Sequence, residues 1–272
     1  MVHAVSRLGT DIVKVHTIPA VPSRSDYFFE LFRDLPKQGA GSDLSTGRAL
    51  AFLRDLPAEP RILDIGCGSG RQTLALLGST GGRVTAVDTH QESLDRLAAA
   101  AQEAHAGDRV ETRCESMDAL DFPAGSFDLI WCEGAIYNVG FQTGLEMWRP
   151  LLRDGGSVGI SELTWLNDRR PQPVVDFLAN AYPGMGSLAE NRKRSVDAGY
   201  QPLGGFVLPD EDWWDGYYDV LEARIAEQRP DAIDAEHLEV LDGTQTEIDL
   251  FRTRQGSYGY AFYLLSRLVR AR

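Results

Sequence analysis

Cysteine, lysine and long apolar runs are scarce in this chain of 272 residues. Its three cysteines are too few and odd in number, which excludes a disulfide framework. No run approaches the ~18 apolar residues of a membrane-spanning helix, and the first residues lack the apolar core of a signal peptide. Three lysines are also too few for a polybasic membrane anchor. We therefore expect a cytoplasmic protein with no membrane partner.

Positive charge is scarce as well, and the negative charge is concentrated in one segment. The chain has 27 basic and 40 acidic residues, which gives a net charge of −13. Residues 209–251 contain fourteen acids and only two bases, Arg224 and Arg229, so this segment alone carries −12. The rest of the chain is nearly neutral, which argues against a nucleic acid bound through its phosphates.

The composition is otherwise that of an ordinary globular protein, with 43% apolar and 25% charged residues. Its length fits one large domain or two small ones. Residues 1–25 are rich in turn-forming residues and indicate an arm, and helical apolar spacing follows at 27–35 and 44–56. We expect residues 1–56 to form an N-terminal helical lid.

Strands and helices alternate through the middle of the chain. Short apolar strands are expected at 61–65, 83–87, 109–114, 127–131 and 157–163. Helical patterns lie between them at 70–77, 91–106 and 143–152. This alternation indicates βαβ units and a parallel sheet with helices on both faces. After residue 165 the rhythm changes, and we expect helices at 171–182, 187–198, 210–228 and 231–251 and strands at 200–208 and 258–268.

The strongest signal is the stretch Leu63-Asp64-Ile65-Gly66-Cys67-Gly68-Ser69-Gly70. A strand is expected to end at Ile65, and glycines let the backbone turn sharply before a helix begins near Gly70. The first turn of that helix offers unpaired N–H groups to a polar or negative group. In an open α/β sheet this turn lies at the carboxyl edge of the strands, where ligands bind.

The spacing of the glycines narrows the choice of ligand class. A dinucleotide fingerprint requires a third glycine at position 71, which is arginine here, and the Gly-Lys-Ser/Thr of a P-loop is absent. Asp64 would repel a pyrophosphate and suits an ammonium group. Asp88, at the end of the second strand, is placed to accept hydrogen bonds from ribose hydroxyls. One ligand satisfies both features, namely a nucleoside with an amino-acid tail and no phosphate.

Residues 64–70, followed by Ala86-Val87-Asp88, resemble the first two motifs of the class I S-adenosylmethionine-dependent methyltransferases. The likeness continues in three further segments, 115–120, 127–130 and 152–156. It covers residues 60–163 and is greatest to small-molecule methyltransferases of the ubiquinone-biosynthesis type. The resemblance implies a Rossmann-like α/β three-layer sandwich with a seven-stranded, mostly parallel sheet in the order 3-2-1-4-5-7-6. This methyltransferase domain is expected at 57–272, with a helical insertion at about 165–257 that adds to the lid.

The resemblance also implies a site for S-adenosylmethionine, whose product is S-adenosylhomocysteine. Asp64 is expected near the methionine amino group, Asp88 at the ribose and Met117 under the adenine. The full set of expected cofactor contacts is Asp64, Gly66, Cys67, Gly68, Gly70, Asp88, Thr89, Ser116, Met117, Glu133 and Gln38. The partner of the adenine amino group stays open between Ser116, Asp118 and a backbone carbonyl.

Contacts with the methyl acceptor are expected where strands four and five end and in the acidic helices. The candidates are Tyr137, Glu162, Trp165, Trp213 and Tyr217. Trp213 and Tyr217 are four residues apart and would share a helix face. A pocket walled by acids and aromatic rings favours a cationic or amine-bearing acceptor, because an anion would be repelled. The simpler alternative is a solvated acidic helix with a packed aromatic stripe.

The expected reaction is methyl transfer from S-adenosylmethionine to a nucleophilic atom of a small molecule. The alternatives are a non-catalytic S-adenosylmethionine-binding module and, less favoured by the glycine spacing, a nucleotide-cofactor oxidoreductase. No catalytic residue is assigned, because direct displacement does not require a fixed general base. The histidines and cysteines show no metal-ligand spacing, and Cys114 and Cys132 are expected in the core. We expect a monomer or a homodimer.

Overall fold

Seven strands form a single sheet in the order β3-β2-β1-β4-β5-β7-β6 in the computed structural model, which describes residues 23–268. The strands are β1 (Arg61–Ile65), β2 (Arg83–Asp88), β3 (Val110–Cys114), β4 (Phe127–Glu133), β5 (Leu152–Trp165), β6 (Tyr200–Val207) and β7 (Tyr258–Arg267). The first five run parallel to one another, while β7 runs antiparallel to both of its neighbours. The predicted α/β class and strand order are therefore confirmed.

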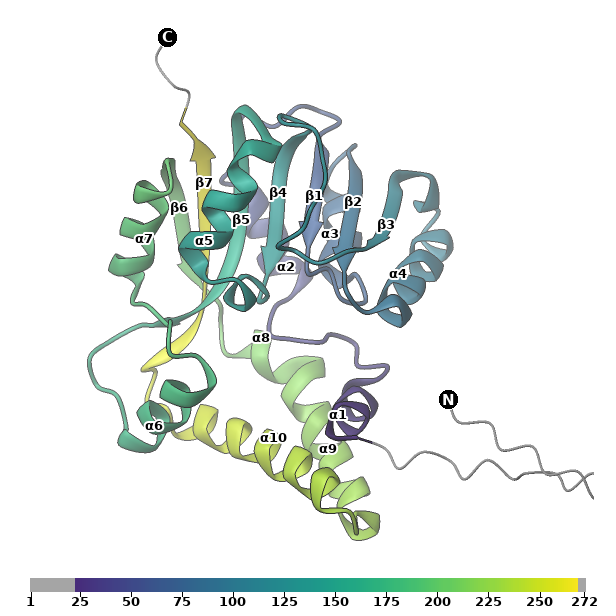
Figure 1. The fold of residues 1–272 in the computed structure, drawn as a ribbon, viewed down its shortest axis with the longest axis vertical. Helices are drawn as coiled ribbons and strands as arrows, with labels where there is room; N and C mark the ends of the chain where they lie inside the picture. Colours follow the sequence, from purple (N-terminus) through teal and green to yellow (C-terminus); the bar gives the residue numbers. More distant parts are fainter. Residues whose placement is uncertain (1–22, 269–272) are drawn as a thin grey trace, which may run out of the picture.

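Helices cover both faces of the sheet and make it the middle of three layers (Figure 1). One face carries α2 (Asp43–Leu50), α3 (Arg71–Ser79) and α4 (Gln91–Glu103), and the other carries α5 (Phe141–Trp148) and α7 (Leu188–Asp197). The alternation along β4 explains both layers. Leu129 and Trp131 pack under the first set of helices, whereas Ile130 and Cys132 pack under the second. Because both faces of β4 are buried, its sequence is a nearly continuous apolar run.

A group of helices lies below the carboxyl edge of the parallel strands, and we call it the cap (Figure 1). Its members are α1 (Arg24–Phe32), α6 (Gln172–Ala181), α8 (Glu211–Trp213), α9 (Asp219–Gln228) and α10 (Ala235–Thr253). They share a third apolar cluster with members such as Leu31, Leu221 and Phe251, each fully buried. The N-terminal segment and the segment after β6 thus build one body, although they are far apart in the sequence.

Three sequence expectations need correction. The helix expected at 210–228 is interrupted, because Asp215 and Gly216 leave helical geometry and Gly216 has a φ of +74°. The helix expected at 44–56 ends at Leu50. Cys114 is exposed at the end of β3 and is not in the core, whereas Cys132 is fully buried as expected.

The remaining helices and strands lie close to where the sequence placed them. Most of the arm expected at 1–25 lies outside the described residues. Between residues 23 and 268, no helix combines the length and the apolar character that crossing a membrane requires.

Candidate cofactor and acceptor sites

The turn after β1 is held in a conformation that requires glycine. Gly66 and Gly68 have φ values of +71° and +53°, and Gly70 begins α3 with a φ of +87°. A Cβ atom on Gly66 would lie 2.5 Å from the Cβ of Ala135, and one on Gly70 would lie 2.2 Å from Leu97. The glycines thus allow both the turn and the close approach of neighbouring segments.

Asp88, at the end of β2, holds this turn in place. Its Oδ2 accepts a hydrogen bond of 2.9 Å from the Gly68 N–H, and its Oδ1 accepts one of 3.0 Å from the His90 N–H. The backbone N–H groups of Gly66 and Cys67 also donate to the carbonyl of Val87, at 2.8 and 3.1 Å. Each carboxylate oxygen of Asp88 keeps a further lone pair for a ligand hydroxyl.

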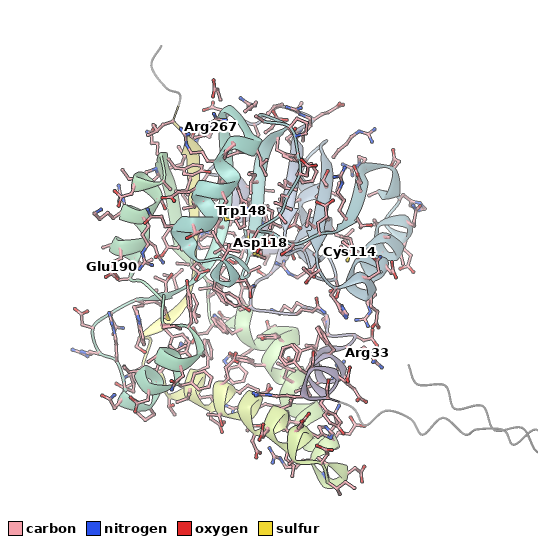
Figure 2. The ribbon with its side chains drawn as sticks, in the orientation of Figure 1. Arg33, Cys114, Asp118, Trp148, Glu190 and Arg267 are labelled. Atoms are coloured by element: carbon pink, nitrogen blue, oxygen red, sulfur yellow. The ribbon has the colours of Figure 1, made fainter. Side chains whose placement is uncertain are left out.

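A cavity of about 330 Å³ opens beside Asp88 at the carboxyl edge of the sheet. Its lining residues are Gly66, Val87, Asp88, Thr89, Glu115, Ser116, Met117, Ala135 and Asn138. Five residues expected from the sequence therefore meet here, namely Gly66, Asp88, Thr89, Ser116 and Met117. The turn that contains Ser116 and Met117 is anchored by Trp148, whose indole N–H donates to the Met117 carbonyl at 2.9 Å. Figure 2 labels Cys114, Asp118 and Trp148, which surround this edge of the sheet.

Glu115 gives a direct test of whether this cavity fits a polar ligand. Its Oε1 lies 3.5 Å from Arg113, but its Oε2 is buried and accepts no hydrogen bond from residues 23–268. A buried oxygen without a donor is costly, and a ligand hydroxyl or amino group would satisfy it. The cavity residues therefore fit a nucleoside that carries such donors.

Asp64 lies beneath the glycine turn and not on the cavity surface. It is fully buried, and its carboxylate accepts hydrogen bonds from the Thr73 hydroxyl at 2.6 Å and the Gln72 side chain at 3.5 Å. Burial raises its pKa to about 7, although the hydrogen bond from Thr73 opposes this rise. Cys67 is also buried, at 2% exposure, and fills space in the core.

Gln38 and Glu133 lie on the other side of the turn, in contact with the start of α3. The Gln38 Oε1 accepts a hydrogen bond of 3.0 Å from the Ser69 N–H. Glu133, at the end of β4, accepts hydrogen bonds from Thr46 at 2.7 Å, from the Trp131 indole at 2.8 Å and from Arg71 at 2.5 Å. The Glu133 carboxylate is therefore already surrounded by donors, and Gln38 occupies the Ser69 N–H, two residues before α3.

Comparisons with known proteins bear on this cavity. Residues 62–156 match the model of a family described as a methyltransferase domain. This part of the chain is therefore similar to a methyltransferase domain. The matched region runs from β1 through the start of β5 and contains the glycine turn, Asp88 and the whole cavity. The resemblance to the class I S-adenosylmethionine-dependent methyltransferases, noted from the sequence motifs, is thus confirmed.

Three individual proteins illustrate the range of similarity. The 27-O-demethylrifamycin SV methyltransferase of Amycolatopsis mediterranei is 26% identical over 167 residues, which are 56% of this chain and 58% of that protein. The ubiquinone biosynthesis O-methyltransferase of Xanthomonas axonopodis pv. citri is 33% identical over 111 residues, which are 39% and 44% of the two chains. The chain thus spans about half the length of these curated relatives. A structure of an S-adenosylmethionine-dependent methyltransferase from Geobacter sulfurreducens with S-adenosyl-L-homocysteine superposes with a TM-score of 0.73, at 22% identity over 88% of this chain and 96% of that one.

The acceptor candidates expected from the sequence fall into two groups. Glu162 is fully buried on β5, and Tyr137 is 44% exposed in the turn after β4. Trp213 and Tyr217 lie in the cap, where Trp213 stacks on Tyr260 of β7 with a ring separation of 5.1 Å. Trp165 packs against Tyr258, also in the cap cluster, with Arg170 over its other face.

Sequence reasoning missed several residues of these sites. Glu115, Ala135 and Asn138 line the cavity beside Asp88, and Tyr182 and Tyr260 lie near Glu162. Glu115 directly follows the strand that ends at Cys114, so a carboxylate at a strand end was an available signal. Tyr182 comes from the segment between α6 and α7, and nothing in its local sequence points to the sheet edge.

Proposed function

We propose that the protein transfers a methyl group from S-adenosylmethionine to a small-molecule acceptor. The cavity beside Asp88 carries this proposal, because it combines the glycine turn, an acidic residue at the end of β2 and the unpartnered oxygen of Glu115. In this assignment Asp88 accepts hydrogen bonds from the ribose hydroxyls, and Glu115 accepts one from the nucleoside. Gly66 leaves room for the amino-acid tail, and Met117 packs against the adenine.

S-adenosylmethionine, when bound, would supply an electrophilic methyl group on a sulfonium. The protein's contribution is then to hold the acceptor in line and to exclude water. The cap lies over the carboxyl edge of the sheet and is suited to this task. Gln38 and Glu133, which already bind protein groups, fit a role in closing the site better than direct contact with the cofactor.

We propose further that the acceptor bears an amine. The end of β5 contributes Glu162, and the cap contributes the buried aromatic rings of Trp213 and Tyr217 on a strongly acidic segment whose acids lie mostly at the surface. A cation gains from carboxylates and from ring faces, whereas an anion would be repelled in a cleft of low dielectric constant. The names of the two curated relatives point to oxygen acceptors, so a direct comparison of nitrogen and oxygen acceptors separates this chain from them.

A two-stage experiment tests the proposal. Calorimetry should first detect binding of S-adenosylhomocysteine to the full chain. The protein should then be incubated with S-adenosylmethionine and a pool of amines, phenols and carboxylic acids, with mass spectrometry used to find products heavier by one methyl group. Methylated amines support both parts, whereas methylated phenols or acids alone contradict the amine acceptor. Absence of cofactor binding contradicts the function itself.

A further inference from the structure

Glu162 is a buried carboxylate without a partner. It is 0% exposed on β5, and neither of its oxygens accepts a hydrogen bond of good geometry from residues 23–268. Three other buried or half-buried acids are satisfied: Asp64 by Thr73, Glu133 by Arg71, and Glu247 by the Tyr218 hydroxyl at 2.7 Å. Because an isolated buried charge is expensive, a carboxylate left in this state indicates a donor that is supplied from outside the chain.

The surroundings of Glu162 are aromatic and contain no ion-pair partner among the described residues. Tyr182, between α6 and α7, lowers the pKa of Glu162 more than any other neighbour and so stabilises its carboxylate. Burial raises the pKa of the Tyr260 and Tyr263 hydroxyls of β7, and the negative charge of Glu162 raises both further. Arg194 of α7 weakly favours the charged form of Glu162, but its own guanidinium donates to the Gly184 carbonyl and to Asn191.

Two further groups complete the set around Glu162. Cys132 of β4 is fully buried, and its thiol pKa is raised by burial first and also by nearby acids that include Glu162. Tyr137 lies with its ring centroid 5.9 Å from that of Tyr182. Within the described part of the chain, Arg194 acts on Glu162 only through its charge, and both oxygens of Glu162 are without a hydrogen-bond donor.

One turn connects this cluster to the cofactor cavity. Residues 134–138 follow β4, and the Gly134 N–H donates to the carbonyl of Ser161, the residue before Glu162. Ala135 and Asn138 of the same turn line the cavity, while Tyr137 faces Tyr182. The Tyr260 hydroxyl also lies against Gly134, 3.3 Å from where a Cβ atom would be. A molecule that touches Glu162 is thus separated from the cofactor cavity by a single turn.

From this arrangement we infer that Glu162 is a catalytic residue that receives the proton of the acceptor's nucleophilic nitrogen, an assignment that rests on the proposed methyl transfer. An acceptor amine enters as an ammonium group and donates a hydrogen bond to a Glu162 oxygen. The N–H bond then breaks, its electron pair stays on nitrogen as the nucleophilic lone pair, and the proton forms an O–H bond with Glu162. The surrounding tyrosine rings stabilise the cation before this transfer.

The pKa of Glu162 suits this role. Burial raises it to about 8, although the nearby Tyr182 hydroxyl and the charge of Arg194 oppose this rise. A group that titrates near the working pH can both take up a proton and release it afterwards. The ionised fraction of Glu162 grows as the pH rises, so the rate should rise with pH up to this region. Tyr182, which is only half-buried, provides a route from the carboxyl group to solvent.

The test compares Glu162→Gln with Glu247→Gln in the full-length protein. Glu247 is the matched control, because it is a second carboxylate in apolar surroundings but is hydrogen-bonded to Tyr218 in the cap. Benzylamine and N-methylbenzylamine serve as nitrogen probes and p-cresol as an oxygen probe, with S-adenosylmethionine as donor. Calorimetry measures cofactor affinity, thermal denaturation checks folding, and kcat is measured as a function of pH.

We expect Glu162→Gln to lower kcat on the amines by about 100-fold or more, to abolish the rise of the rate with pH and to leave cofactor affinity unchanged. Glu162→Asp should retain part of the rate, and Glu247→Gln should behave like the wild type. Retention of the wild-type rate and pH profile by Glu162→Gln would overturn the inference. Methyl transfer to p-cresol alone would also overturn the inference, and so would cofactor binding without transfer to any probe. Neither result would contradict the proposed cofactor site. Failure to bind the cofactor would remove the proposed function and, with it, this assignment.

Discussion

Three carboxylates at the carboxyl edge of the sheet have very different surroundings, although all of them lie in strands of the sheet. Asp88 is half-buried and accepts hydrogen bonds from two backbone N–H groups. Asp64 is fully buried but hydrogen-bonded, and Glu162 is fully buried and unpartnered within residues 23–268. The chemistry open to each follows from these contacts, since a partner lowers the cost of ionisation and burial raises it.

Asp88→Ala should weaken the binding of S-adenosylmethionine and S-adenosylhomocysteine by roughly 10- to 100-fold, because it removes charged hydrogen bonds worth about 1.5–3 kcal/mol. Isothermal titration calorimetry measures this directly. Asp95→Ala is the control, since Asp95 is exposed on α4 and bonds only to Gln91 among the described hydrogen bonds. Equal affinities of the two variants would place Asp88 outside the cofactor site.

Glu162 should also make the stability of the protein depend on pH. Its pKa rises from 4.5 to about 8 on folding, so the folded state holds a proton that the unfolded chain releases. This stabilisation is complete below about pH 4.5 and is lost as the pH rises through 8, at up to about 1.4 kcal/mol per pH unit. Glu162→Gln cannot lose a proton, so we expect its Tm to fall less than that of the wild type between about pH 6 and about pH 9.

Thermal denaturation at both pH values provides the measurement. Glu239→Gln, a substitution at an exposed position on α10, should follow the wild-type curve. A parallel decline of all three Tm values would show that Glu162 ionises without penalty in the folded protein.

At the scale of elements, the break between α8 and α9 depends on one glycine. Gly216 has a φ of +74°, and a Cβ atom there would lie 3.4 Å from Pro36. Gly216→Ala should therefore destabilise the protein by about 1 kcal/mol or more, because a side chain disfavours the left-handed region. Gly243 lies inside α10 with open space around its missing Cβ, so Gly243→Ala should stabilise by about 0.5–1 kcal/mol.

Urea denaturation of the two alanine variants gives both values. Opposite signs would confirm that Gly216 is required for its backbone conformation and that Gly243 is not. If Gly216→Ala were neutral, α8 and α9 would be able to join into the continuous helix that the sequence pattern favours.

At the scale of the whole molecule, the N-terminal segment ties the cap to the cofactor half of the sheet. Phe29 stacks on His90 with a ring separation of 4.5 Å, and Asp34 pairs with Arg96 at 3.4 Å. Further along, Gln38 contacts Ser69 and Asp43 pairs with Arg71 at 3.1 Å. These contacts all reach α3, α4 or the turns before them, next to the cavity.

Cofactor binding should consequently protect the N-terminal segment as well as the glycine turn. We expect amide hydrogen exchange at residues 33–42 and 66–70 to slow when S-adenosylhomocysteine binds, because a bound ligand stabilises the closed arrangement. Exchange in α7, on the far end of the sheet, is the internal control. Protection limited to residues 66–70 would contradict a lid function of the N-terminal segment.

The sequence by itself determined the sheet and the cofactor half of the site. The glycine turn, Asp88 and the alternating apolar strands act through local geometry, because a turn of this kind must follow a strand and must lie at its carboxyl end. Gly66 and Asp88 could therefore be assigned to one site from sequence patterns, and the family resemblance added Thr89, Ser116 and Met117. All five line one cavity. The prediction of one continuous helix through Trp213 and Tyr217 was wrong, because Asp215 and Gly216 between them leave helical geometry and Gly216 has a φ of +74°.

Only the tertiary structure decided which polar groups have partners. The side chains of Arg71, Thr46 and Trp131 donate hydrogen bonds to Glu133. Its carboxylate is therefore not available to a ligand, although its position at a strand end had suggested that it would be. Glu162 and Glu115 each kept an oxygen without a donor among residues 23–268, a property that depends on side chains brought in from distant segments. Periodicity and spacing describe how a chain relates to its own neighbours in sequence. The pairing of a buried carboxylate depends on what the fold brings to it, and for Glu162 the described part of the fold brings tyrosine rings and no direct ion-pair partner.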